Sequence, residues 1–253
     1  MNKWIGKIAV VTGASSGIGA AIVKDLAQNG LTVIGLARRS EKIDEIATEM
    51  TTAPGKIYSH KCDLADFNSI KETFKWIEEK FQKVHILVNN AGLACIGTVL
   101  NPSDEQTAKL NEVINVNFTG LVHTTREAFR LMQAANDYGM IINISSIVDS
   151  VIPFPSSSTV YPATKHAVRA LTEIIRQELI VANNDKIKIS NLSPGVVRTN
   201  FGHAAGRPNA EEFYKTMPGL EGVDISQGVI YLLSTPHNVN VTQLTIKPVG
   251  EKF

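Results

Sequence analysis

Short apolar segments alternate with longer amphipathic segments along most of the chain. Residues 7–12 and 32–37 are rich in Val, Ile and Leu at consecutive positions, which indicates strands buried on both faces. Residues 18–30 instead repeat apolar side chains at helical spacing, and Gly30 is a typical helix C-terminal signal. The pattern therefore predicts buried strands joined by helices.

This alternation predicts a Rossmann-type, doubly wound α/β fold, in which a parallel sheet of about seven strands is flanked by helices on both faces. The expected strands are residues 7–12, 32–37, 56–62, 85–89, 140–145, 186–192 and 243–246. The expected helices are residues 18–30, 40–50, 67–82, 103–135, 160–182 and 225–233, with Ser40 as a candidate N-cap. Such folds bind ligands beyond the carboxyl ends of their strands, so functional residues are expected there.

The chain shows no linker, repeat or low-complexity stretch. We therefore expect residues 1–253 to form a single dinucleotide-binding domain, a normal size for an α/β fold. The exception to the regular pattern is the polar, Pro- and Gly-rich stretch at about 194–222. Irregular segments of this length are often lids, so a substrate loop is expected there.

Composition narrows the class of protein. Hydrophobic residues make up 43% and charged residues 19%, as in soluble globular proteins. The net charge of +1 and the absence of a basic stripe argue against a nucleic-acid partner. The two cysteines, Cys62 and Cys95, make neither a disulfide framework nor a zinc motif, and no metal is expected. With no secretory leader and no apolar run of membrane-spanning length, a cytoplasmic location without a membrane span is expected.

A glycine-rich turn, TGASSGIG at residues 12–19, lies between the first strand and the first helix. Gly13 permits a tight turn, Gly17 lets the backbone approach phosphates, and Gly19 lets the helix pack closely. A plain strand–helix turn is the alternative, but the position after the first strand of a βα series favours a dinucleotide site, with the helix N-terminus facing the pyrophosphate. Its expected cofactor contacts are Gly13, Ser15, Ser16, Gly17, Ile18 and Gly19.

The end of the second strand indicates which dinucleotide binds. An acidic residue there holds the ribose of NAD, whereas this chain has Arg38 and Arg39, whose guanidinium groups suit a 2′-phosphate. NADP(H) is therefore predicted, the alternative being that both arginines are merely solvated. After the third strand, Asp63, followed by Leu64, is a candidate acceptor for the adenine amino group or, equally, the N-cap of the next helix.

A phenol and an amine, Tyr161 and Lys165, lie one helical turn apart and share a helix face. The cation is expected to lower the phenol pKa, which gives Tyr161 an acid/base role near neutral pH. The pair Ser145-Ser146 ends the preceding strand and offers a hydroxyl to a substrate oxygen. An unrelated surface Tyr–Lys pair is the alternative, which the serine pair disfavours.

Six motifs in order make the chain resemble the short-chain dehydrogenase/reductase family over nearly its whole length. They are TGxxxGxG at 12–19, NNAG at 89–92, the asparagine of 117–120, the serine pair at 145–146, YxxxK at 161–165 and the PG turn at 194–195. The interval from Ser146 to Tyr161 is slightly longer than is usual in the family, with the extra residues within 153–159.

The resemblance implies a role for each motif residue. Tyr161 exchanges the proton with the substrate oxygen, Lys165 binds the nicotinamide ribose and lowers the Tyr161 pKa, and Ser146, the second serine of the pair, orients the substrate oxygen. Asn117 holds a water in a proton relay toward Lys165. The other residues implied beside the cofactor are Asn90, Ala91, Gly92, Pro194, Gly195, Val197 and Thr199.

The substrate side is expected to be mostly apolar, which suits a lipophilic alcohol, aldehyde or ketone. Its expected residues are Leu93, Ala94, Cys95, Ser146, Val148, Ile152, Phe154, Val196, Phe201, Phe213 and Met217. Residues 4–7, 35–39 and 244–250 resemble the farnesol dehydrogenase-like branch of the family, which favours a terpenoid alcohol. The alternatives are a steroid or other carbonyl reductase and a non-catalytic NADP-binding regulatory protein. The family also implies a homodimer or homotetramer, formed through the two long helices.

Overall fold

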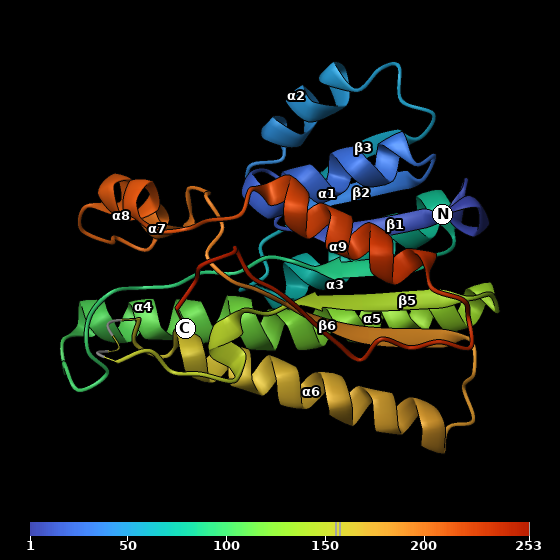
Figure 1. Cartoon of the computed structure of the whole chain (residues 1–253). Helices are drawn as coiled ribbons and strands as arrows, with labels where there is room; N and C mark the ends of the chain where they lie inside the picture. The colour runs from blue at the N-terminus through green and yellow to red at the C-terminus, as the bar shows by residue number, and fades with distance from the viewer. Residues whose placement is uncertain (155, 157, 253) are drawn as a thin grey trace.

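The computed structural model describes residues 1–154, 156 and 158–252, and of Phe213 only the backbone. Its centre is one parallel sheet with the strand order β3-β2-β1-β4-β5-β6-β7 (Figure 1). The strands are β1 (Ile8–Thr12), β2 (Thr32–Ala37), β3 (Lys56–Lys61), β4 (Ile86–Asn89), β5 (Gly139–Ile144), β6 (Ile187–Pro194) and β7 (Gln243–Ile246). Each expected strand and the doubly wound sheet are thus confirmed.

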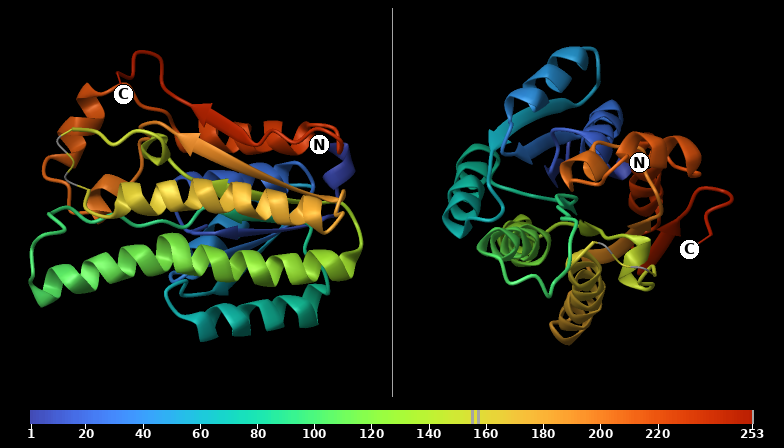
Figure 2. Two further views of the ribbon diagram at one scale, coloured as in Figure 1. Left: turned by 90° about the horizontal axis from the view of Figure 1, so that it is seen from below. Right: turned by 90° about the vertical axis from the view of Figure 1, so that its left-hand side faces the viewer.

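Helices cover both faces of the sheet, as Figure 2 shows along two further directions. The α-helices are α1 (Gly17–Gln28), α2 (Glu41–Glu49), α3 (Phe67–Phe81), α4 (Asp104–Ile114), α5 (Leu121–Ala135), α6 (Tyr161–Val181), α7 (Phe201–Ala204), α8 (Ala210–Thr216) and α9 (Gly222–Ser234). Short 3₁₀ turns occur at η1 (Asn2–Trp4) and η3 (Ile147–Asp149), and η2 (Asn115–Gly120) is a π-helical segment that joins α4 to α5. The α4–η2–α5 rod lies beside α6 on one face, whereas α1 and α9 lie on the other.

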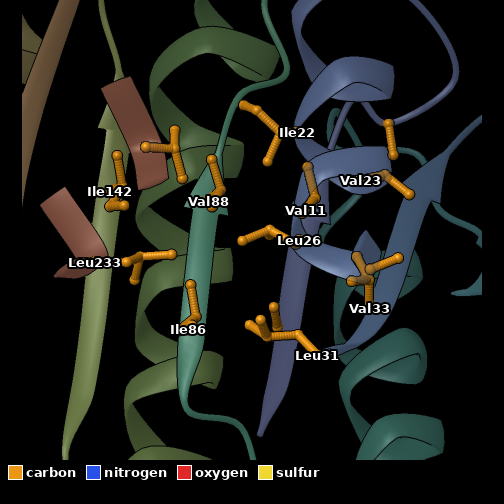
Figure 3. Close-up of a cluster of buried hydrophobic side chains, with 14 of the residues drawn as sticks. Val11, Ile22, Val23, Leu26, Leu31, Val33, Ile86, Val88, Ile142 and Leu233 are labelled. Carbon is orange, nitrogen blue, oxygen red and sulfur yellow. The ribbon is translucent and has the colours of Figure 1, made fainter. Parts of the chain in front are cut away.

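Two apolar layers hold the helices on the sheet. On one face, Val11, Val33 and Val88 of the strands pack with Leu26 of α1 and Leu233 of α9, all fully buried (Figure 3). The neighbouring strand positions point to the opposite face, where a second buried cluster joins them to α3 and α5. Each such side chain removed from water contributes roughly 1.5–3 kcal/mol. Burial on both faces explains why inner strands such as β1 and β4 are apolar at consecutive positions.

The strand order reverses between β1 and β4, and this reversal sets the location of the site. The chain runs outward from β1 to β3 and then returns to β4 on the other side of β1. The connections that leave β1 and β4 therefore diverge and open a crevice at the carboxyl edge. The short helices α7 and α8 lie at that edge (Figure 1).

The structure corrects the expected helices at four places. The last helix begins at Gly222 rather than at Ile225, and α7 and α8 lie within the stretch expected to be irregular. The expected helix 103–135 is interrupted by η2. Ser40 occupies the N-cap position of α2, but its side chain makes no capping hydrogen bond. Among the described residues, no helix has both the length and the apolar character needed to cross a membrane.

Candidate active site

The glycine loop between β1 and α1 is too crowded for larger residues. Gly13 has φ +66°, and a Cβ there would lie 2.8 Å from the Ala91 Cα. A Cβ on Gly19 would lie 2.2 Å from the Gly13 carbonyl oxygen and 2.5 Å from the Asn90 Nδ2. Gly19 is therefore required by the fold of the loop itself as well as by helix packing.

Side-chain hydrogen bonds join this loop to the Asn90-Ala91-Gly92 turn after β4. The Thr12 hydroxyl accepts from the backbone N–H groups of Asn90 and Ala91, both at 3.0 Å. The Asn90 amide donates to the carbonyls of Thr12 at 2.9 Å and Gly13 at 3.2 Å. Thr12 was not predicted as a functional residue, although its place before the first glycine is a usable signal. The two turns form one rigid floor at the crevice.

The N-terminus of α1 fits a dinucleotide pyrophosphate. Ser16 is the N-cap, but its side chain does not cap the helix, so the first-turn N–H groups remain available for an anion. Gly17 has φ +55°, and a Cβ there would lie 3.1 Å from Thr199 Cγ2. The start of the expected lid is thus within reach of the glycine loop. Ser15 and Ile18, both partly buried, complete the turn.

The two arginines after β2 lie at the exposed end of the crevice. Arg38 Nη1 donates to Glu112 Oε1 of α4 at 3.1 Å, and Arg39 is exposed. Near them, Asp63 Oδ1 accepts from the Ala65 N–H at 3.0 Å. The alternative that Asp63 caps the next helix is wrong, because Asp66 is the N-cap of α3.

The Asp66 side chain accepts from the Asn68 N–H at the start of that helix. Leu64 is buried, and its carbonyl oxygen lies 2.3 Å from where a Cβ on Gly120 would be. The turn after β3 therefore packs directly on η2.

Tyr161, Lys165 and Ser146 come together at the carboxyl end of β5. Tyr161 is the first residue of α6, with Lys165 one turn later, and Ser146 is the N-cap of η3. The Ser146 side chain accepts from the Val148 N–H at 3.3 Å and lies near enough to the Tyr161 phenol to lower its pKa. Ser145 is buried instead, and its hydroxyl donates to the Lys165 carbonyl oxygen at 3.4 Å. Ser146 is thus the serine that faces the phenol.

The electrostatics of this pair differ from the sequence-based expectation. Burial raises the pKa of Tyr161 to about 12, against an opposing hydrogen bond from Ser146. Burial also lowers the pKa of Lys165 to about 8. The Lys165 Nζ lies 5.8 Å from the phenol ring centroid and donates to the Ile144 carbonyl at 2.9 Å. The expected net lowering of the phenol pKa is therefore absent, because desolvation of the phenolate outweighs the opposing effect of Ser146.

Asn117 braces the turn that follows the glycine of the NNAG motif. Its Oδ1 accepts from the Leu93 N–H at 2.7 Å, and its Nδ2 donates to the Leu93 carbonyl at 2.8 Å and to the Thr164 hydroxyl at 3.1 Å. Thr164, inside the YxxxK motif, was not predicted. A Cβ on Gly92 would lie 3.6 Å from Lys165 Nζ and 3.7 Å from Asn117 Oδ1, so these groups surround one small space. The proton relay through Asn117 stays a prediction.

Two of the expected substrate residues lie beside the catalytic helix. Cys95 is buried, and its thiol lies 3.0 Å from the Thr159 hydroxyl, which also donates to the Cys95 carbonyl at 3.2 Å. Thr159 holds a φ of +47°, which is strained for a β-branched residue. The Phe201 ring centroid lies 5.5 Å from that of Tyr161.

Other expected substrate residues are less closely involved. Ile152 and Phe154 are 60% and 99% exposed, so the structure does not bring them onto the site. The partly buried residues are Leu93, Ala94, Ser146, Val148, Val196 and Met217. The Phe213 side chain lies outside the described part of the chain.

The segment after β6 is held to the rest of the sheet edge by its backbone. The Gly195 N–H donates to the Ile246 carbonyl at 2.8 Å, and the Val196 N–H donates to Glu251 Oε1 at 3.0 Å. Val197 pairs with Leu220 as an isolated bridge. A hollow of about 450 Å³ opens between the start of this segment and α8. Its lining residues, mostly polar, are Arg198, Thr199, Asn200, His203, Glu211, Tyr214 and Lys215.

Known proteins are similar to this chain over most or all of its length. A family model described as short chain dehydrogenase matches residues 7–209. The chain is 44% identical to a farnesol dehydrogenase of Aedes aegypti across all of both chains. It is 40% identical to the dehydrogenase/reductase SDR family member 11 of Bos taurus, with 99% of each chain covered. A solved alcohol dehydrogenase from the archaeon Thermococcus sibiricus, complexed with 5-hydroxy-NADP, is similar at a TM-score of 0.81 and 30% identity, over 97% of this chain and 98% of that one.

Proposed function

The chain belongs to the short-chain dehydrogenase/reductase family of oxidoreductases, and we propose that it interconverts a lipophilic alcohol and its aldehyde or ketone with NADP(H). The observation that carries the proposal is that Ser146, Tyr161 and Lys165, one helical turn after Tyr161, converge at the same sheet edge as the glycine loop. A proton donor, an oxygen-binding hydroxyl and a phosphate cradle are the groups that such a reaction requires.

The three side chains divide the acid/base work. In reduction, the Tyr161 phenol gives its proton to the substrate oxygen while the Ser146 hydroxyl hydrogen-bonds that oxygen. A protonated Lys165 favours the phenolate that results, because opposite charges stabilise each other. A bound nicotinamide cofactor supplies or accepts the hydride. In oxidation Tyr161 must first lose its proton, so its raised pKa suits the reductive direction at neutral pH.

Loss of the phenol hydroxyl tests the mechanism. A Tyr161→Phe variant should lose turnover by about a hundredfold or more, since general acid–base groups contribute roughly 10²–10⁴. NADPH binding, followed by fluorescence titration, should be unchanged. Turnover that survives the substitution would rule out this mechanism. Cofactor binding without turnover of any alcohol or carbonyl by the wild type would instead favour a regulatory NADP-binding protein.

Arg38 and Arg39 support NADP(H) over NAD(H), because they directly follow β2, where a 2′-phosphate would lie. The similar archaeal enzyme was solved with an NADP derivative, which agrees with this choice. The ratio of KM for NADP⁺ and NAD⁺ measures the preference, and Arg38→Asp should move it toward NAD⁺. Equal or NAD-favouring values for the wild type would contradict the proposal.

A farnesol-like terpenoid alcohol is the favoured substrate. The identity to a farnesol dehydrogenase and the apolar ring of Phe201 beside Tyr161 support this choice. A panel of terpenoid, steroid and aromatic alcohols and carbonyls, followed by NADPH absorbance, ranks the candidates. Turnover confined to charged hydroxy acids would contradict a lipophilic substrate.

We also propose a homodimer or homotetramer formed through α4–α5 and α6. Ile114 of α4 and Ile174 and Ile180 of α6 are apolar but exposed in the single chain, as residues buried by a second copy would be. Light scattering coupled to size-exclusion chromatography measures the mass. An Ile174→Glu variant should yield monomers if this face forms the contact.

A further inference from the structure

Asp149 is a buried carboxylate directly behind the catalytic serine. It ends η3, three residues after Ser146, and is only 2% exposed. An ionised group in such a place is costly unless other groups compensate its charge. Its partners therefore show what the carboxylate does there.

One oxygen of Asp149 is fixed to β6. Its Oδ2 accepts from the Asn191 Nδ2 at 2.8 Å and from the Ser193 hydroxyl at 2.5 Å. The Asn191 Nδ2 also lies 2.8 Å from Gln243 Oε1 of β7. These contacts hold the η3 turn, and with it Ser146, against two strands of the sheet.

The other oxygen lacks a hydrogen bond within the described structure. Asp149 Oδ1 is buried, and the nearest cation is Arg169 Nη1 of α6, at 3.8 Å. That guanidinium is half exposed, so solvent weakens its effect. The carboxylate therefore directs an incompletely balanced negative charge toward α6.

Both titrating catalytic groups respond to this charge. For Tyr161, burial is the main cause of its raised pKa, and Asp149 raises the pKa further, as does Tyr214. For Lys165, burial lowers the pKa, and Asp149 opposes that effect. A negative charge near both groups favours the protonated phenol and the protonated amine alike.

We propose that Asp149 is a positioning residue of the catalytic centre, whose carboxylate fixes the Ser146 turn on β6 and holds Tyr161 in the protonated form that carbonyl reduction requires. This inference rests on the proposed function, because it assigns the favoured direction to the same site. The groups that contact the Asp149 carboxylate are Arg169 from α6 and the uncharged Asn191 and Ser193 from β6, and its charge also acts on Tyr161 and Lys165 of α6.

An Asp149→Asn variant removes the charge and keeps the shape. The pH at which alcohol oxidation reaches half its plateau should fall by about half a unit or more, since one nearby charge commonly shifts a pKa by this amount. An Arg169→Gln variant should move the same midpoint upward by a smaller amount, because the negative charge is then less balanced. The exposed Asp185, in the turn before β6, provides the matched control Asp185→Asn, which should leave the midpoint unchanged.

A second readout does not depend on turnover. With ¹³Cζ-labelled tyrosine, assigned through Tyr161→Phe, NMR reports the phenolate fraction of Tyr161 at a fixed alkaline pH. This fraction should rise in Asp149→Asn and fall in Arg169→Gln. If wild type and variants lack turnover while the fraction changes as expected, the proposed function fails and the role of Asp149 stands.

The pH midpoint of alcohol oxidation should fall in Asp149→Asn and rise in Arg169→Gln. A purely structural role of Asp149 would not produce these opposite shifts, because it does not depend on charge. An unchanged or lower phenolate fraction in Asp149→Asn would overturn the proposal. Should that variant fail to fold, Arg169→Gln decides, because its side chain is half exposed. A phenolate fraction in Arg169→Gln that stays constant or rises would then overturn it.

Discussion

The guanidinium of Arg38 has a protein partner at the place where a 2′-phosphate is proposed to bind. Arg38 and Glu112 meet at 3.1 Å with both side chains about half exposed. Pairs this exposed contribute about 0–1 kcal/mol, so the contact is easily exchanged for another anion. Glu112 nevertheless adds a negative charge beside the proposed phosphate. It should therefore weaken NADP(H) binding without preventing it.

A Glu112→Gln variant should bind 2′,5′-ADP about twofold to fivefold more tightly, in line with the small energy of exposed ion pairs. Affinity for 5′-AMP should stay constant, because that ligand lacks the 2′-phosphate. Isothermal titration calorimetry at low and high salt measures both affinities, and the gain should shrink with salt. Glu105→Gln is the matched control, since Glu105 also pairs on α4, with Lys109. Weaker binding of 2′,5′-ADP by Glu112→Gln would show that Glu112 orients Arg38 instead.

At the scale of elements, η2 is the turn that holds Asn117 and packs on the turn after β3. Gly120 closes this π-helical segment, and a Cβ on it would lie 2.3 Å from the Leu64 carbonyl oxygen. To make room for such a Cβ, the Leu64 carbonyl would have to move, and the turn after β3 would have to move with it. The close packing of η2 on Leu64 therefore depends on glycine at position 120.

A Gly120→Ala variant should lose about 1–3 kcal/mol of unfolding free energy, the usual cost of overpacking. Gly228→Ala on α9 is the matched control, because the Cβ there would meet the Ile246 Cδ1 at 2.5 Å, the movable end of a side chain. Both variants gain helix propensity of up to about 1 kcal/mol, so the control should be nearly neutral. Urea denaturation compares the two. Equal losses would contradict the distinction between backbone and side-chain contact.

The predictable elements are those with a strong period and a clear end. Inner strands such as β1 and β5 were predictable because burial on both faces favours apolar residues at consecutive positions, and α1 because Gly30 follows it with a positive φ. The segment η2 was not, since a π-helical turn has the composition of the α-helix around it. The short helices α7 and α8 depend on tertiary contacts, such as the Gly202 N–H donating to the Tyr214 hydroxyl at 3.1 Å.

The candidate site likewise contains features that the sequence predicts and features that it does not. Gly13, Ser146 and Tyr161 were predictable, because strand ends and motif spacing place them at one edge. Asp149 was not, because its partners lie on strands far away in the sequence. The Tyr161 pKa was expected in the wrong direction, since spacing along a helix reveals the amine but not the desolvation of the phenol.

At the scale of the whole molecule, the opposite edge of the sheet holds another buried titratable group. His85 precedes β4 and is 5% exposed, and its Nδ1 accepts from the Ile8 N–H at 3.2 Å. The ring therefore carries its proton on Nε2, which lies 3.8 Å from Asp137. Burial, assisted by Lys7, lowers the pKa of His85 to about 4. The folded state is therefore more stable when His85 is neutral.

This requirement makes stability depend on pH in one direction. The unfolded chain protonates His85 near its ordinary pKa of about 6.5, whereas the folded chain does so only near pH 4. The stabilisation is complete above pH 6.5 and is lost as pH falls toward 4, by on the order of 2–3 kcal/mol.

A His85→Gln variant keeps a hydrogen-bond acceptor but does not titrate. Its unfolding free energy should decline less steeply than that of the wild type between pH 7 and about 4.5. Guanidinium denaturation across this range measures the slopes, with the exposed His203→Gln as control. Parallel slopes for wild type and His85→Gln would show that other groups govern acid unfolding.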